Sequence, residues 1–190
     1  MLLCSATTSD LPSVAELVNS AYRGETSRQG WTTEADYIDG QRTDATTLRR
    51  DLEAQPRAHL LTLRDQSGGP LLGTVWLEPA EGETWYLGML TVRPDLQARR
   101  LGRELLQAAE DFARDLGARR IRMSVVNIRD TLIAWYVRRG YALTGETLPF
   151  PYDEAVFGQP RRADLSFVVL EKAISPVRAG NGAPSPLRVS

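Results

Sequence analysis

The prediction of the fold starts from the stretch VRPDLQARRLGRELLQAAEDFA, residues 92–113. It passes from the end of an apolar segment through a short turn into a segment whose apolar residues recur at helical spacing. Leu105, Ala109 and Phe112 would share one face of that helix, and Gly117 suits the position just past its end. The pattern therefore predicts a strand, a turn and a helix in immediate succession.

Three arginines, Arg99, Arg100 and Arg103, gather where this helix begins. The first N–H groups of a helix lack acceptors and carry partial positive charge, so an oxyanion is favourable there, above all a pyrophosphate. Gln97 would offer a further donor to that anion. On charge alone, the arginines could equally form a solvated helix face paired with neighbouring acidic residues.

The segments around this stretch predict an α/β domain with the element order βααβββαβαββ, a mixed sheet and helices on both faces. Residues 59–63, 71–78 and 84–92 would form an antiparallel meander. A right-handed crossover would place residues 119–126 parallel to residues 84–92. We further expect a strand in the opening residues, a helix over 11–22 capped by Asp10, a short helix capped by Thr43 or Asp44, a helix over 131–140, and strands over 141–146 and 164–172.

Residues 1–173 are predicted to form a single domain, because a chain of 190 residues suffices for one well-formed core. The tail over residues 174–190 is rich in Pro, Gly, Ala and Ser and is expected to be mobile. Residues 23–44 show no clean period, and an irregular segment of this length within a domain favours a functional role.

A hydrophobic fraction of 42%, a charged fraction of 25% and a net charge of −1 are typical of a soluble globular protein. The small net charge gives no general attraction to nucleic acid. No run approaches the roughly 20 apolar residues of a membrane span, and the opening residues lack the basic start of a signal peptide. We therefore expect a cytoplasmic protein without nucleic-acid or membrane partners.

The single cysteine and single histidine limit the available chemistry. One cysteine excludes an internal disulfide and a cysteine-based zinc site, and no metal site is expected. We interpret Cys4 as a small buried strand residue, and His59 as a packed or half-exposed strand residue. A serine or cysteine triad would require His59, and nothing near it in the sequence indicates that role.

Two segments together resemble the signature motifs of the GNAT-type N-acetyltransferases. Val92-x-Pro94, Gln97 and Gly102 match the family pattern Q/R-x-x-G-x-G/A that follows a V-x-P turn. LIAWYVRRGYALTGE, residues 132–146, resembles the family's closing motif, in which a helix with tyrosine precedes Gly-Tyr/Phe at the start of a strand. The resemblance extends over about residues 1–173 and includes the order of the elements.

The resemblance implies an enzyme that moves an acetyl group from acetyl-CoA to a primary amine by direct attack. In the family the strand at residues 87–92 splays from the strand at 120–126, and the pantetheine arm fills the gap. The pyrophosphate would lie on the backbone N–H groups of residues 97–103, in agreement with the argument from charge. The implied cofactor-binding residues are Leu90, Thr91, Val92, Gln97, Ala98, Arg99, Arg100, Leu101, Gly102, Arg103, Arg129 and Tyr136.

Two of these positions depart from the family pattern. Arg100 stands where the pattern has its first glycine. A positive φ would strain an arginine, so we expect a negative φ there, with the amide still directed at phosphate and the side chain turned away. Family members often carry asparagine seven residues before the tyrosine, where this chain has Arg129; Asn127 lies two residues earlier.

Acetyl transfer requires a neutral amine, stabilisation of the oxyanion and a proton for the departing thiolate. Tyr136 matches the family's tyrosine near the thioester sulfur and is the candidate general acid, although it could simply pack beside Trp135. The backbone N–H of Leu90 is the candidate oxyanion donor. Glu78 and Glu34 are the candidate bases, with a chain of waters as an equal alternative.

Acceptor specificity is expected from residues 23–44 and from the loop before the last strand. Aromatic side chains there could form the walls of an acceptor pocket: Trp31, Tyr37, Phe150, Tyr152 and Phe157. The second loop could instead cover a sheet edge or form a homodimer contact. Alternatives for the whole chain are transfer of another acyl group, transfer to a protein N-terminus, and a regulator that binds coenzyme A without turnover.

Overall fold

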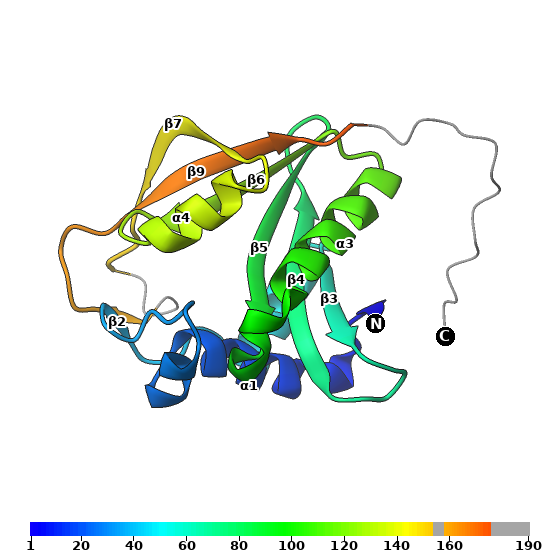
Figure 1. Ribbon diagram of the computed structural model, residues 1–190, viewed down its shortest axis with the longest axis horizontal. Coiled ribbons are helices and arrows are strands. Elements are labelled where there is room, and N and C mark those ends of the chain that lie inside the picture. The colour runs from blue at the N-terminus through cyan, green and yellow to red at the C-terminus, as the bar shows by residue number, and fades with distance from the viewer. Residues whose placement is uncertain (154–157, 176–190) are drawn as a thin grey trace.

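A computed structural model of the chain describes residues 1–153 and 158–175 (Figure 1). Within these ranges seven strands form one mixed sheet, as the sequence predicts. The strands are β1 (Leu2–Ser5), β3 (His59–Arg64), β4 (Leu71–Pro79), β5 (Thr84–Val92), β6 (Arg120–Val126), β7 (Ala142–Pro149) and β9 (Ser166–Ala173). Their order across the sheet is β1-β3-β4-β5-β6-β9-β7, and only β5 and β6 run parallel to each other.

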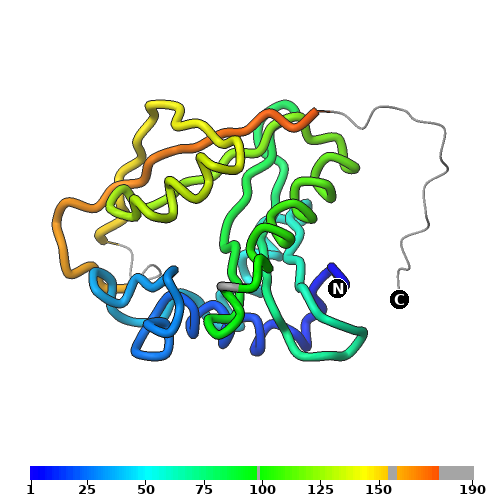
Figure 2. The backbone as a smooth tube through the Cα atoms, in the orientation of Figure 1, coloured from blue at the N-terminus to red at the C-terminus, as the bar shows by residue number. Residues whose placement is uncertain are grey.

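Two layers of helices cover the sheet (Figure 2). Leu60 packs against the helices near the N-terminus, whereas the next residue, Leu61, packs against the helix that follows β5. Neighbouring residues of a strand point to opposite faces, so these helices lie on opposite sides. The first layer contains α1 (Leu11–Tyr22) and α2 (Ala45–Ala54), and the second contains α3 (Leu101–Asp115) and α4 (Asp130–Val137).

Several short elements were not predicted. The segment 23–44 contains a 3₁₀ helix, η2 (Glu25–Gln29), and a two-residue strand, β2 (Ile38–Asp39), which pairs with β8 (Gln159–Pro160). Two further 3₁₀ helices, η1 (Thr8–Asp10) and η3 (Pro94–Arg99), precede α1 and α3. Elements of two to six residues are too short to show a hydrophobic period, so the sequence pattern does not reveal them.

Strand β5 leaves its neighbour β6 after a short parallel contact. Pairing joins only residues 84–86 to residues 120–122, and beyond this point β6 continues to pair with β9 on its other side. On its other edge β5 carries a bulge, because the register shifts so that Met89 and Leu90 both face Val75. Met89 has a φ of 51° there, which is uncommon for a residue other than glycine.

Two expectations about single residues are wrong in detail. Cys4 is exposed, because β1 is a four-residue strand at the edge of the sheet. Asp10 stands at the start of α1 but does not cap it; its carboxylate accepts hydrogen bonds from the Thr7 N–H at 2.7 Å and from Arg64 at 2.7 Å. The Asp44 carboxylate does cap α2, accepting from the Thr47 N–H at 2.8 Å.

His59 packs between aromatic rings, as expected from its place in a strand. Its ring stacks on Trp85 at 5.8 Å and meets the edge of Phe112 at 5.0 Å. Burial lowers the pKa of its imidazole. None of the helices in the described ranges combines the length and apolar character needed to cross a bilayer. The expected mobile tail lies outside the described residues from position 176 onward.

The expectation of a negative φ at Arg100 is wrong. It has φ 64° and ψ −1°, the left-handed conformation, and it joins η3 to α3. The chain must turn sharply there because η3 runs directly into α3 without a linker. Glycine adopts this conformation without steric cost, which accounts for the glycine in the family pattern at this position.

We expect Arg100→Gly to raise the free energy of unfolding by about 0.5–1 kcal/mol, since relief of the left-handed strain exceeds the added entropy of the unfolded chain. Arg99→Gly is the matched control, because it removes the same charge one residue earlier, at the end of η3. It should lower the stability by about 0.5–1 kcal/mol. Urea unfolding of both variants tests this, and a destabilised Arg100→Gly would show that the arginine is not strained.

Candidate active site

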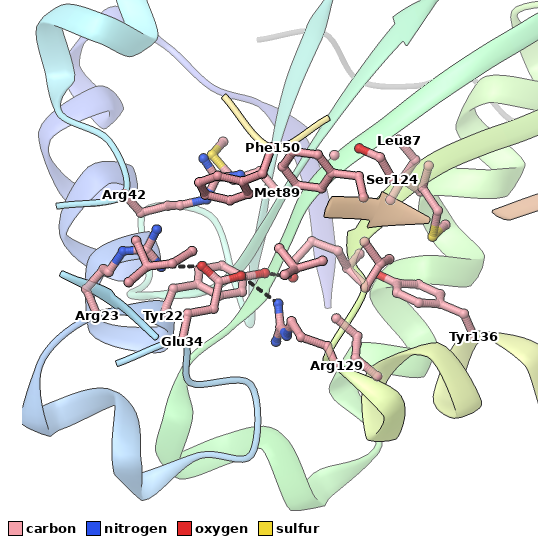
Figure 3. Close-up of a pocket in the computed structure, with 18 residues that line it drawn as sticks. Tyr22, Arg23, Glu34, Arg42, Leu87, Met89, Ser124, Arg129, Tyr136 and Phe150 are labelled. Carbon is pink, nitrogen blue, oxygen red and sulfur yellow. Dashed lines mark hydrogen bonds and ion pairs between the residues drawn. The ribbon is translucent and has the colours of Figure 1, made fainter. Parts of the chain in front are cut away.

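Two cavities meet where β5 leaves β6. The larger, about 410 Å³ and here called the turn cavity, lies between η3, the start of α3 and α4. The smaller, about 70 Å³ and here called the inner cavity, lies deeper, among α1, the 23–44 segment and the separated parts of β5 and β6 (Figure 3). Four residues line both cavities: Tyr22, Leu90, Leu132 and Tyr136.

The structure brings most of the predicted cofactor-binding residues to the turn cavity. Its lining includes Leu90, Val92, Gln97, Arg100, Gly102, Arg103 and Tyr136. Four of the predicted residues whose side chains are described do not line it: Thr91, Arg99, Leu101 and Arg129. Arg99 is exposed, Leu101 packs into the core, and the Thr91 hydroxyl donates to the Met89 carbonyl at 3.0 Å. Ala98 belongs to η3, and its side chain is not described.

The start of α3 faces the turn cavity without a cap from its own side chains. Arg100 occupies the N-cap position and makes no side-chain capping hydrogen bond, while its carbonyl accepts from the N–H groups of Arg103 and Glu104. The earliest N–H groups of a helix have no intrahelical acceptor. Together with the side chains of Arg100 and Arg103, they form a setting that favours an anion.

Gln97 has a different role from the one predicted. Its Oε1 accepts from the Trp31 N–H at 2.9 Å, and its Nε2 donates to the Thr32 hydroxyl at 2.8 Å. The side chain therefore holds the 23–44 segment against η3 instead of offering a donor to an anion. Glycine at position 30 leaves room for this side chain, since a Cβ there would lie 2.5 Å from Gln97 Oε1 and Gln97 would have to move.

Glu34 lies in a buried ion-pair cluster of the inner cavity (Figure 3). One carboxylate oxygen contacts Arg23, and the other contacts Arg129 Nη1 at 2.8 Å. Burial alone would raise the pKa of Glu34, but Arg129 and Arg23 outweigh it and hold that pKa below its usual range. A carboxylate that is ionised and engaged on both oxygens is a weak proton acceptor.

Arg129 points into the inner cavity and does not line the turn cavity. Besides Glu34, it donates to the Thr32 carbonyl at 2.7 Å and lies 5.6 Å from the centre of the Tyr22 ring. The cofactor contact predicted for its side chain therefore has no support in the arrangement of these cavities. Thr32 thus accepts two hydrogen bonds, one on its hydroxyl from Gln97 and one on its carbonyl from Arg129.

Glu78, the other candidate base, lines neither cavity. It accepts from the indole N–H of Trp76 at 3.0 Å and stands opposite Tyr86 in the sheet. The register of β4 and β5 thus places Glu78 near the start of β5, whereas the cavities open at its end.

Tyr136 is buried and borders both cavities, as a general acid should. Burial raises the pKa of its phenol, so the hydroxyl retains its proton at neutral pH. Its ring meets Trp135 edge-on at 5.0 Å and Tyr141 at 5.6 Å, contacts that fix its orientation.

Tyr22 was missed by the sequence reasoning. As the last residue of α1 it fits the apolar face of that helix, and nothing in the local pattern distinguishes it from a packing residue. Its hydroxyl donates to the Leu90 carbonyl at 2.6 Å and so binds the bulge of β5. Burial raises the pKa of this phenol as well.

The described acceptor candidates fall into two places: Trp31 lies apart from Tyr37, Phe150 and Tyr152, which lie close to one another. Trp31 is 41% exposed and lines the turn cavity, 6.1 Å from Trp135 between ring centres. Tyr37 packs against the apolar cluster that contains Phe150, and the rings of Phe150 and Tyr152 lie 5.1 Å apart. The Tyr152 hydroxyl also exchanges hydrogen bonds with the backbone of Leu165. Phe150 does line the inner cavity, and Phe157 lies outside the described residues.

Comparison with known proteins identifies the same family. The model of the acetyltransferase (GNAT) family matches residues 13–141. Comparison with curated proteins finds no match.

Solved structures show the same fold. The ribosomal-protein-alanine N-acetyltransferase from Brucella melitensis has a TM-score of 0.65 and 21% identity, over 92% of this chain and 100% of that chain. The structure of yncA from Salmonella typhimurium with its cofactor acetyl-CoA has a TM-score of 0.65 and 19% identity, over 96% and 99%. The IAA acetyltransferase from Bacillus cereus has a TM-score of 0.61 and 15% identity, over 91% and 99%.

The family match covers more than half of the chain, and the splayed strands, the turn and the tyrosine lie where the family motifs predict them. The chain therefore belongs to the acetyltransferase (GNAT) family and is an acetyl-CoA-dependent N-acetyltransferase.

Proposed function

We propose that the turn cavity takes acetyl-CoA, that the inner cavity takes the acceptor, and that the acceptor is a primary amine of a small molecule or peptide. The observation that carries this assignment is the meeting of the two cavities at Tyr22, Leu90, Leu132 and Tyr136. A group transferred between two substrates must pass through a point that both can reach, and these four residues surround it.

The residues of the turn cavity suit coenzyme A. The start of α3 with Arg100 and Arg103 would hold the pyrophosphate, and the edge of β5 from Leu90 to Val92 would hold the pantetheine arm. That edge has backbone groups to offer because its pairing with β6 ends at Tyr86. When bound, the thioester supplies an activated acetyl group.

We assign Tyr136 as the general acid, because its protonated phenol lies at the meeting of the cavities. A phenol with a raised pKa holds its proton until a stronger base forms beside it, and a departing thiolate is such a base. We assign the N–H of Leu90 to the oxygen that gains negative charge. Tyr22 supports this donor by binding the Leu90 carbonyl.

Neither candidate carboxylate is placed to take the proton of the amine. Glu34 is engaged by two arginines, and Glu78 lies outside the cavities. We therefore favour proton loss through water and assign Glu34, with Arg23 and Arg129, to holding the wall of the inner cavity in position. Between them these residues join α1, the 23–44 segment and the start of α4.

Thiol release from acetyl-CoA in the presence of amines tests the proposal. The panel comprises polyamines, amino acids, aminoglycosides and short peptides, and mass spectrometry identifies the acetylated product. Release that depends on one class of amine is expected. Binding of acetyl-CoA without release on any amine would instead support a regulator that binds coenzyme A, and release only with longer acyl groups would indicate another acyltransferase.

Tyr136→Phe should lower kcat by about 10²-fold or more, the usual contribution of a general acid. The dissociation constant of coenzyme A should change little, because the ring and its packing remain. Tyr141→Phe is the matched control: its hydroxyl donates to Glu110 and it lines neither cavity, so kcat should persist. Equal kcat in wild type and Tyr136→Phe would assign Tyr136 to packing.

Glu34→Gln should lower the free energy of unfolding by about 3 kcal/mol at pH 7, because it leaves buried guanidinium groups with less opposite charge. The folded pKa of Glu34 lies below its usual value near 4.5. Its contribution to stability is therefore complete above that value and is lost as the pH falls through the folded pKa. The gap between wild type and variant should narrow below pH 4.5.

Urea unfolding at several pH values measures this gap. Glu25→Gln is the control, because the Glu25 side chain is 90% exposed where it pairs with Arg28, and its effect should stay within about 0.5 kcal/mol at every pH. A gap for Glu34→Gln that does not change with pH would contradict the ion-pair interpretation.

A further inference from the structure

A second cationic site adjoins the turn cavity. A groove of about 450 Å³, here called the basic groove, lies between the middle of α3 and the end of α4. Arg103 and Arg139 line both the groove and the turn cavity, so the two spaces are neighbours. The complete lining of the groove is Arg103, Leu106, Gln107, Glu110, Arg138, Arg139 and Lys172.

Positive charge dominates this groove. Among the described residues that line it, four are cations and Glu110 is the one acid. Glu110 is 2% exposed and already engaged, since it accepts from Lys172 Nζ at 2.6 Å and from the Tyr141 hydroxyl at 2.9 Å. Burial, followed by the charges of Arg138 and Arg103, lowers the pKa of Arg139. Like charges crowd one another here, and an anion would relieve the repulsion.

The side chain of Arg139 is fixed in place between the basic groove and the turn cavity. Its guanidinium lies 3.5 Å from the centre of the Trp135 ring, and its Nη1 donates to the Trp135 carbonyl at 2.6 Å. Its Nε is buried and has no hydrogen-bond partner among the described residues. These contacts fix the guanidinium at the border of the two spaces, where its remaining N–H groups can donate to an anion.

Coenzyme A carries an anion besides the pyrophosphate, namely the 3′-phosphate on its ribose. A phosphomonoester bears a charge of about −1.5 to −2 at pH 7 and offers three acceptor oxygens. When the pyrophosphate lies on the start of α3, the ribose is the next group along the molecule. The groove begins at that point, because Arg103 belongs to both the first turn of α3 and the groove.

We propose that the basic groove binds the 3′-phosphate of coenzyme A, with Arg139 and Arg103 as its principal donors and Arg138 as a further cation. Arginine suits this role because its planar donors match phosphate oxygens in pairs. The proposal rests on the proposed function, which places the pyrophosphate at the start of α3. It makes the enzyme selective for coenzyme A over 3′-dephospho-coenzyme A.

Isothermal titration of the purified chain with coenzyme A and with 3′-dephospho-coenzyme A tests the proposal. Wild type should bind the dephosphorylated ligand about 10-fold to 100-fold more weakly, as expected for lost hydrogen bonds between charged groups. Arg139→Gln should bind both ligands with similar affinity, close to that of wild type for 3′-dephospho-coenzyme A. Arg114→Gln is the control, because Arg114 pairs with Asp111 on α3 and does not line the groove, and it should retain the wild-type ratio.

The outcomes separate this proposal from the assignment of the cofactor. Equal affinity of wild type for the two ligands overturns the phosphate site while leaving coenzyme A binding intact. Failure to bind either ligand contradicts the cofactor assignment itself. If Arg139→Gln weakens both ligands equally, the side chain acts through its packing on Trp135 and the proposal fails. Arg138→Gln, at an exposed position, gives a second variant that should reduce the ratio even if Arg139→Gln does not fold.

Inorganic phosphate distinguishes coenzyme A from an unrelated anion as the occupant. Phosphate at 10-fold excess over its own dissociation constant should compete with coenzyme A but not with 3′-dephospho-coenzyme A. Competition with both ligands would place the anion on the pyrophosphate site and contradict a separate 3′-phosphate site.

Discussion

The loss of pairing between β5 and β6 is the constraint on which the rest of the structure depends. After residues 84–86 the inner edge of β5 is no longer paired with β6, although β6 itself continues to residue 126 and stays paired with β9 on its far edge. Backbone groups at such an edge need partners, and a ligand with amide groups can supply them. The turn cavity, the inner cavity and the tyrosine between them all lie along this edge.

The bulge of β5 determines where Leu90 lies on that edge. Because Met89 and Leu90 both stand opposite Val75, Leu90 is displaced from the regular ladder. The surrounding sheet stabilises the unusual φ of Met89. Tyr22 of α1 donates a hydrogen bond to the carbonyl of Leu90 and so fixes the displaced residue. The place where the two cavities meet is thus bounded by α1 on one face of the sheet and by α4 on the other.

The long elements could be predicted from the sequence because each shows a clear period or a strong turn signal, as residues 59–92 and 101–117 do. The motif around Gln97 and Gly102 also directed attention to a turn that does border a cavity. The roles of Gln97, Arg129 and Glu34 could not be predicted, since each is decided by a partner many residues away, such as Thr32. The backbone of Arg100 was predicted wrongly because arginine itself disfavours a positive φ, whereas the glycine of the family pattern at this position indicated one.

The double attachment of Thr32 has a consequence for how new specificities arise on this scaffold. Gln97 of η3 and Arg129 at the start of α4 hold this single residue, and Gly30 leaves room for the Gln97 side chain. The 23–44 segment is therefore not an independent module that can be exchanged for another sequence. Any replacement of this segment that keeps its attachment to η3 and α4 must therefore preserve the hydroxyl of Thr32 as well as the position of its carbonyl.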